Sequence, residues 1–113
     1  MVQRLDAGAG IALTAVAPTS LVTLRCEFPT RAGELRAAGR QVLGFVITSA
    51  ACFLDIGYSD DDGVTFRDRG TRDRILPASA YLIDIVAIGT HVRLTFTRDT
   101  ADATLNFVHS MRP

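Results

Sequence analysis

The residues of this chain that could most readily do chemistry lie in one short stretch, GYSDDDGVTF, at positions 57–66. Three consecutive aspartates supply the hard oxygen ligands that Ca²⁺ prefers. An EF-hand loop does not fit, because aligning Gly63 with the sixth position of that loop places Tyr58 first and Arg69 twelfth. Hard oxygen ligands need only cluster, so a looser calcium site is an open alternative. Its candidate ligands are Asp60, Asp61 and Asp62.

The same stretch is also a strong turn signal. Asp-Gly at positions 62–63 suits a tight β-hairpin, since glycine adopts the positive φ angle that such a turn requires. On this interpretation Cys52–Tyr58 is one arm and Val64–Phe66 begins the other, with the aspartates capping backbone amides at a solvated tip. We favour this structural interpretation over a bound metal ion.

Side chains suited to nucleophilic or metal-assisted catalysis are few. His91 and His109 are the only histidines, and no G-x-S-x-G nucleophile motif is present. The cysteines and histidines do not have the spacing of a zinc site. A small serine hydrolase is the remaining enzymatic alternative, and it would require Ser59 or Ser110 to meet a histidine in a pocket. We therefore predict no enzyme, no catalytic residue and no cofactor.

Four arginines gather in RDRGTRDR, residues 67–74, which we interpret as an exposed loop because charges occupy most of its positions. Such a loop either carries internal ion pairs, each of small energetic value, or presents guanidinium groups to an acidic neighbour. On the second interpretation the arginines belong to an interface with another protein. They are Arg67, Arg69, Arg72 and Arg74.

Size and composition narrow the choice of function. The 113 residues predict a single domain, 1–113. The chain has 12 basic and 12 acidic residues and no net charge, which argues against nucleic-acid binding through a basic surface. No apolar run approaches the ~20 residues of a membrane helix, so we expect no membrane partner. Hydrophobic residues make up 48% of the chain, which predicts an efficient core or an apolar surface that meets a partner.

Most of the chain has the pattern of β-strands. Apolar and polar residues alternate in His91–Arg98, so one face packs on a core and the other meets water or a partner. The run Tyr81–Ile88 is apolar on both faces apart from Asp84. It is therefore predicted to be a central strand, joined to the next one by a tight hairpin at Gly89-Thr90. The predicted strands are residues 11–17, 21–26, 42–48, 52–58, 81–88, 91–98 and 104–109.

These strands predict an all-β fold, an antiparallel β-sandwich of jelly-roll type with about seven to eight strands. Residues 29–41 are expected to form a loop or one or two helical turns. Residues 1–18 are interpreted as an N-terminal arm that could add a strand to a neighbour. The candidate interface residues of this arm are Leu5, Ile11, Leu13 and Val16. The sequence leaves open whether Cys26 and Cys52 form a disulfide.

The arrangement of residues 42–110 resembles that of small β-sandwich proteins of tailed bacteriophage particles. In such proteins a strand ending in a Ser/Asp-Gly turn leads to a Pro/Ala segment, and then to a Val-Arg-hydrophobic strand that ends in a polar turn. The chain departs from this pattern in its extra aspartate and its arginine-rich segment. The matching residues are Ser59-Asp60-Asp61-Asp62-Gly63-Val64-Thr65-Phe66, Leu76-Pro77-Ala78, Val92-Arg93-Leu94 and Arg98-Asp99-Thr100.

The resemblance implies a structural virion protein that self-associates, with a trimer favoured, and binds the capsid surface as a decoration protein, or binds the tail. Such a protein would be made in the host cytoplasm and located in the virion. The alternative is a small ligand- or carbohydrate-binding β-sandwich module. This alternative would need Tyr58 or Tyr81 to be exposed beside the Asp60–Asp62 turn, because sugar rings stack on aromatic side chains.

Overall fold

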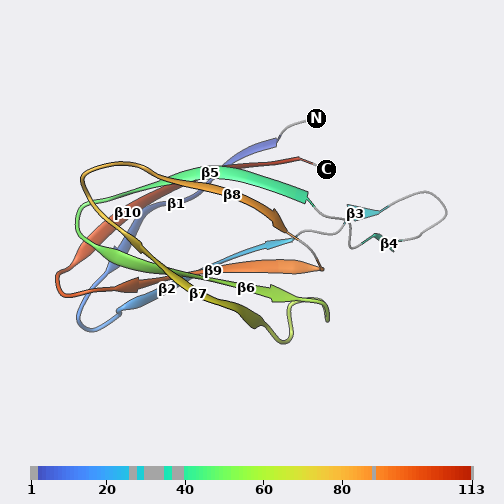
Figure 1. The fold of residues 1–113 in the computed structure, drawn as a ribbon, viewed down its shortest axis with the longest axis horizontal. Coiled ribbons are helices and arrows are strands. Elements are labelled where there is room, and N and C mark those ends of the chain that lie inside the picture. Colours follow the sequence, from blue (N-terminus) through green and yellow to red (C-terminus); the bar gives the residue numbers. More distant parts are fainter. Residues whose placement is uncertain (1–2, 26–27, 30–34, 37–39, 88, 113) are drawn as a thin grey trace.

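The computed structural model describes residues 3–25, 28–29, 35–36, 40–87 and 89–112 (Figure 1). Every regular element in this part of the chain is a β-strand, and it contains no helix that could span a membrane. The strands are β1 (Gln3–Leu13), β2 (Thr19–Arg25), β3 (Phe28–Pro29), β4 (Leu35–Arg36), β5 (Arg40–Thr48), β6 (Cys52–Ser59), β7 (Arg67–Ile75), β8 (Tyr81–Ala87), β9 (His91–Arg98) and β10 (Ala103–Arg112).

Eight of these strands form two four-stranded antiparallel sheets, which Figure 1 shows as two stacked layers. The first sheet has the order β1-β10-β5-β8 and the second has the order β2-β9-β6-β7, while β3 and β4 pair separately as a short ribbon. Of the described strands in the two large sheets, β6 and β7 alone are consecutive neighbours within one sheet. The chain otherwise alternates between the layers. This order is that of a jelly roll, and the predicted antiparallel β-sandwich is confirmed.

The core lies between the two sheets and is built from alternating side chains. On β9, Val92, Leu94 and Phe96 have no exposed surface, as the alternation in the sequence predicts. On β10, Leu105 and Phe107 are likewise buried, and the centroid of the Phe107 ring lies 6.0 Å from that of Phe96. Because β9 and β10 belong to different sheets, this aromatic pair joins the two layers.

Strand β8 is an edge strand, so the prediction that it is central is wrong. Its inward residue Ile83 is buried, whereas Leu82 and Val86 are 76% and 56% exposed. A strand that is apolar on both faces is usually covered on both faces. In this structure the core covers one face of β8 and the other face meets solvent.

Residues 67–74 form most of strand β7, so the predicted exposed loop is wrong. The segment pairs with β6 and places Arg72 opposite Asp55. Charges are tolerated here because β7 is the edge of its sheet, where long polar side chains reach water. Gly70 has a φ angle of 92° and lies in the part of β7 that faces the register shift between Asp55 and Gly57.

The turn at residues 62–63 forms as predicted. Both residues have positive φ angles, 64° and 83°, and the Val64 N–H donates to the Asp61 carbonyl oxygen at 3.4 Å. Two consecutive positive φ angles are the mark of a type I′ turn. This turn joins β6 to β7, but the second arm begins at Arg67 rather than at Val64. The reason is that Thr65 is hydrogen-bonded back to Asp61, which holds residues 64–66 against the turn.

Gly89-Thr90 does not form a hairpin, because β8 and β9 lie in different sheets. Gly89 has a φ angle of 98°, and a Cβ atom added to it would lie 2.4 Å from the carbonyl oxygen of Ser59. The Thr90 N–H donates to the same oxygen at 2.8 Å. The β8–β9 link therefore packs closely against the carbonyl group of Ser59 at the end of β6, at the point where the chain crosses from one sheet to the other.

Strand β1 pairs with β10 at the other edge of the first sheet, so residues 3–13 are part of the sandwich rather than a free arm. Residues 30–34 and 37–39 lie outside the described residues, and the predicted helical turn falls largely on them. Cys52 is buried with a free thiol, and Cys26 lies outside the described residues.

Candidate functional site

The acidic stretch is organised around the side chain of Asp61. Its carboxylate accepts hydrogen bonds from the Ser59 hydroxyl at 2.7 Å, from the Thr65 backbone N–H at 2.9 Å and from the Thr65 hydroxyl. The Ser59 hydroxyl oxygen accepts a further hydrogen bond from the Gly63 N–H at 3.0 Å. Hydrogen bonds from side chains to nearby backbone groups therefore fix this turn at the rim of the sandwich.

The three aspartates do not converge on a common point. Both carboxylate oxygens of Asp61 are engaged by its neighbours in the turn. Asp60 and Asp62 are exposed, and their carboxylates make no hydrogen bond to other described residues. No group of three or more His, Cys, Asp or Glu side chains in the described part of the chain is placed to hold a metal ion. The structure therefore gives Asp61 the role of a turn former.

The hydrogen bonds to Asp61 predict a measurable pH dependence. Hydrogen bonds from Thr65, followed by that from Ser59, lower the pKa of Asp61 from 3.8 to about 2. Because the folded state has the lower pKa, the charged carboxylate stabilises the fold above pH 3.8, and this contribution is lost as the pH falls toward 2. An NMR titration of the side-chain carboxyl group should give a midpoint of about 2.

Asp61→Asn tests the same effect on stability. This variant should be less stable than the wild type at neutral pH, and the difference should shrink as the pH falls through the range from 3.8 to about 2. Asp60→Asn is the matched control, because the Asp60 carboxylate makes no hydrogen bond to other described residues. A midpoint for Asp61 at 3.8 or higher would contradict the role assigned to these hydrogen bonds.

The turn is tied to the β8–β9 link by Thr90. The Thr90 hydroxyl accepts a hydrogen bond from the Asp62 N–H at 3.0 Å and lies 3.2 Å from the Ser59 carbonyl oxygen, to which it donates. The Nδ1 atom of His91 lies 3.1 Å from the same hydroxyl oxygen. Two connections that are far apart in the sequence therefore form one hydrogen-bonded end of the sandwich.

A cleft of about 400 Å³ opens beside this hydrogen-bonded end. It lies where β6 ends, β7 begins and the β8–β9 link crosses between the layers, so both sheets contribute to its walls. Its volume falls within the range of small-molecule binding sites. The described residues that line it are Tyr58, Ser59, Asp60, Thr65, Arg67, Val86 and Gly89.

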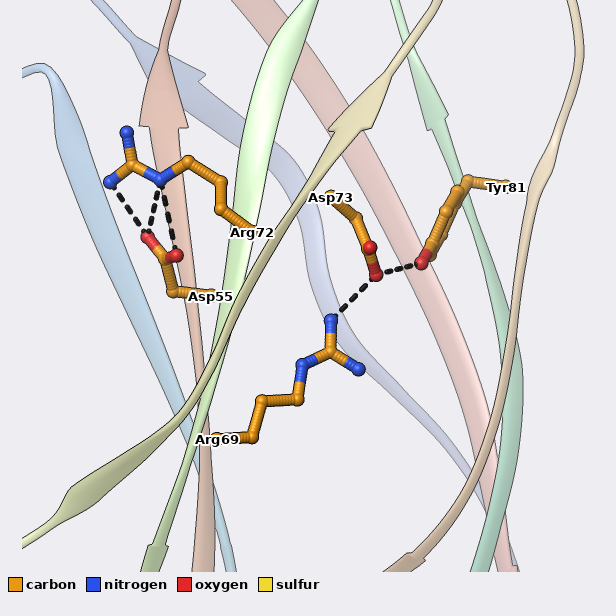
Figure 2. Close-up of polar contacts among 5 residues, drawn as sticks. All are labelled: Asp55, Arg69, Arg72, Asp73 and Tyr81. Atoms are coloured by element: carbon orange, nitrogen blue, oxygen red, sulfur yellow. Dashed lines mark hydrogen bonds and ion pairs between the residues drawn. The ribbon is translucent and has the colours of Figure 1, made fainter.

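Figure 2 shows how two arginines of β7 are used within the chain. The guanidinium group of Arg72 donates hydrogen bonds of 2.8–3.1 Å to the carboxylate of Asp55 on β6. The guanidinium group of Arg69 forms an ion pair with the carboxylate of Asp73, with a nitrogen–oxygen distance of 2.6 Å. The Asp73 carboxylate also accepts a hydrogen bond from the hydroxyl of Tyr81 on β8, which lowers the pKa of Asp73, while burial raises the pKa of Tyr81. Because β7 and β8 belong to different sheets, these contacts bridge the layers.

Arg67 differs from the other arginines of β7. Arg74 pairs with Asp99 at 2.8 Å, so internal ion pairs account for three of the four. For those three, the structure agrees with the internal-pairing interpretation of the sequence. Arg67 is exposed, makes no ion pair or hydrogen bond with other described residues, and lines the cleft. Its cross-strand neighbour is Tyr58.

The two tyrosines occupy different environments. Tyr58 lines the cleft together with Asp60, so it lies beside the turn as the ligand-binding alternative requires, but it is half-buried and packs against the core rather than being fully exposed. Tyr81 is half-buried and its hydroxyl is bonded to Asp73. Tyr58 is therefore the candidate for contact with a ligand.

The structure shows where the serines and histidines considered for catalysis lie. The Ser59 hydroxyl donates to Asp61, and His91 contacts Thr90. Ser110 follows the buried His109 on β10, and adjacent residues of a strand point to opposite faces. The side chains of this second serine and histidine therefore diverge.

The interface residues predicted in the N-terminal segment differ in how exposed their side chains are. Val16 is 95% exposed in the β1–β2 loop, whereas Ile11 packs against the core. Leu13 is fully buried, so in this fold its side chain fills the space between the sheets and is not available to a partner. The side chain of Leu5 lies outside the described residues.

An apolar face that the sequence analysis did not identify lies on the outside of the first sheet. Alternation along β5 places Val42 and Val46 in the core, so the residues next to them point outward. Of the outward residues of the neighbouring strands, Leu82 and Val108 extend this surface, whereas Asp84 and Asn106 place exposed polar groups at its margin. The apolar face comprises Leu43, Phe45 and Ile47 of β5, Leu82 of β8 and Val108 of β10.

No protein-family model and no curated protein matches this chain. The cleft and the apolar face are therefore the features from which its function is inferred.

Proposed function

We propose that this chain is a structural virion protein that self-associates and binds the capsid surface as a decoration protein, or binds the tail. The observation that carries this function is the apolar face on the outside of the first sheet. The sequence pattern of residues 42–110 supports a virion role through its resemblance to phage particle proteins. Support from the fold is an analogy, since jelly rolls are frequent in viral capsid domains and also serve other functions.

The apolar face is continuous across three strands. Phe45 of β5 lies in register between Leu82 of β8 and Val108 of β10. Leu82 is 76% exposed and Ile47 is 48% exposed. A hollow of about 380 Å³, lined by β5 and β10 around Phe45, is of a kind that receives an anchoring side chain from a partner. Soluble monomers rarely leave a contiguous apolar surface open, so we expect a protein to cover it.

The outer face of the second sheet has a different character. On β9, Thr95 and Thr97 alternate with the buried core residues, and the Arg72–Asp55 ion pair spans β6 and β7. Polar groups of this kind are compatible with water. The outer face of the first sheet is therefore the better candidate for contact with another protein, although Leu21 is also exposed on the second sheet.

Strand β8 provides a second route to self-association. It pairs with β5 on one side and forms the sheet edge on the other. Exposed apolar edge strands readily pair with strands of other chains, whereas the charges along β7 protect the corresponding edge of the second sheet. An open edge of this kind suits pairing with a further copy of this chain. The resemblance to phage particle proteins favours a trimer, and a capsid or tail protein as the second partner.

Leu82→Arg is predicted to dissociate the oligomer, because it places an unpaired charge in the middle of an apolar contact. Light scattering should give the wild type three times the mass of one chain, and the variant a single-chain mass at the same concentration. Leu21→Arg is the matched control, since Leu21 is 56% exposed on β2 of the second sheet. This control should keep the wild-type mass.

Binding to the particle is tested by co-sedimentation with empty capsids and with tails encoded next to the gene for this chain. The wild type and Leu21→Arg should sediment with one of the two preparations. A wild-type chain that is strictly monomeric and stays in the supernatant with both would overturn the function proposed.

A further inference from the structure

The cleft beside the turn at residues 62–63 is a separate surface from the apolar face. Its walls come from the end of β6, the start of β7 and the C-terminal end of β8 at Val86, whereas the apolar face runs from Leu82 at the start of β8 across Phe45 of β5 to Val108 of β10. Assembly through the first sheet therefore does not account for the cleft. Its lining combines apolar groups with a cation and a carboxylate that have no partner among the described residues, and small-ligand sites usually combine apolar walls with a few polar or charged groups.

The charge that distinguishes this cleft is the guanidinium group of Arg67. The other three arginines of β7 are held by aspartates at 2.6–2.8 Å, but Arg67 has no such partner among the described residues. A guanidinium group presents its N–H donors as a fork that matches the two oxygens of a carboxylate. An anionic ligand with a planar carboxylate is therefore the complement of Arg67.

The apolar part of the cleft comes from Tyr58 and Val86. Tyr58 is held in place by packing against the core, and Val86 is 56% exposed on β8. An aromatic ring fixed at the edge of a core offers a flat surface on which the C–H face of a sugar ring can pack. Together the two side chains favour a ring-shaped ligand over an extended one.

Acceptors for hydroxyl groups lie on the remaining wall. The Asp60 carboxylate is exposed and makes no hydrogen bond to other described residues. The Thr65 hydroxyl donates to Asp61, so its oxygen retains capacity to accept. Carboxylate and hydroxyl oxygens spaced around an apolar wall suit a ligand with several O–H donors.

The cleft is organised before any ligand arrives. Ser59 is fixed by Asp61 and Gly63 through its hydroxyl, and by Thr90 through its carbonyl oxygen. Gly89 lies so close to the Ser59 carbonyl oxygen that no larger residue fits at this point without displacement. Because this wall is already fixed in the free protein, binding a ligand requires little further loss of conformational entropy.

We propose that this cleft binds an acidic monosaccharide, with the carboxylate on Arg67, the apolar ring face against Tyr58 and Val86, and the hydroxyl groups toward Asp60. The function differs from assembly and uses different residues. A virion protein with this site would attach to surfaces that display acidic sugars.

The test is an NMR titration of the isotopically labelled full chain with glucuronic acid. Binding should shift the amide signals of Tyr58 and Thr65 and the side-chain signal of Arg67, with a Kd of about 1 mM, as expected for a ligand of so few atoms. Glucose has the same ring without the carboxylate. It should bind at least about 10-fold more weakly, because it leaves the guanidinium group unpaired.

Two arginine variants make the test specific. Arg67→Gln should weaken binding of glucuronic acid at least about 10-fold and leave the weak binding of glucose unchanged. Arg74→Gln makes the same change on the same strand at a residue that pairs with Asp99 outside the cleft lining, and it should bind like the wild type. Both arginines are exposed, so both variants should give the dispersed spectrum of the folded chain.

Four results would overturn the acidic-sugar site. These are the absence of shifts at cleft residues, equal affinity for glucose and glucuronic acid, wild-type affinity in Arg67→Gln, and tighter binding of a free amino acid such as glycine. Light scattering of the same samples reports assembly separately. Loss of sugar binding in an intact oligomer therefore counts against the cleft alone, and loss of the oligomer counts against the apolar face alone.

Discussion

Replacing Phe107 with alanine should lower the free energy of unfolding by about 3–5 kcal/mol. Phe107 has no exposed surface and belongs to β10, which lies between β1 and β5 in the first sheet. The centroid of its ring lies 6.0 Å from that of Phe96 in the second sheet and 5.1 Å from that of His109, on which the ring stacks. Truncation leaves a cavity whose walls are fixed in two hydrogen-bonded sheets, so the site cannot easily collapse.

Urea unfolding followed by circular dichroism measures this loss, at one protein concentration because assembly adds stability. Phe53→Ala is the matched control. Phe53 is half-exposed, and its ring lies 5.1 Å from the Arg72 guanidinium, so truncation should cost about 1 kcal/mol or less. Equal losses in the two variants would show that Phe107 does not join the sheets as the structure indicates.

The strands that form this core were predictable because their sequence alternates. His91–Arg98 has the same bounds in the sequence prediction and in the structure, and Val92, Leu94 and Phe96 are buried as expected. The pattern works here because this strand has one face in the core and one in water. Which strands become neighbours is decided by contacts between distant residues, and local patterns do not contain that information.

The two edge strands show where pattern reasoning fails. Residues 67–74 are too charged to resemble a strand, yet cross-strand pairs such as Arg72 with Asp55 stabilise β7 at an edge. Tyr81–Ala87 is apolar enough to resemble a central strand, yet it forms the other edge, with Leu82 in solvent. The sequence of a strand shows that one of its faces is apolar. It does not show whether that face is covered by the chain itself or by another protein.

The cleft was predictable only in part. Tyr58 beside Asp60 is visible in the sequence and motivates the ligand-binding alternative. Arg67 was assigned to an interface loop, because the sequence does not show which of four similar arginines lack an acidic partner. Val86 and Gly89 reach the cleft only because β8 and β9 lie in different sheets. A predicted hairpin at Gly89 would have placed them elsewhere.

Gly89→Ala should lower the free energy of unfolding by about 2–4 kcal/mol. Two penalties combine at this position. The φ angle of 98° is one that residues with a side chain rarely adopt. The added methyl group would also lie 2.4 Å from the carbonyl oxygen of Ser59, which is backbone and cannot rotate away.

Gly70→Ala separates the two penalties. Gly70 has a φ angle of 92°, close to that of Gly89, but a Cβ atom there would meet nothing within 4 Å. This variant should therefore lose only the conformational part, about 1–2 kcal/mol. In Gly89→Ala the clash also pushes the β8–β9 link away from Ser59, so the N–H of Thr90 loses its acceptor and the cleft loses a wall. Binding of glucuronic acid should then weaken in Gly89→Ala and persist in Gly70→Ala. Equal stability and equal binding in both variants would mean that the close approach of Gly89 to β6 does not hold this end of the sandwich together.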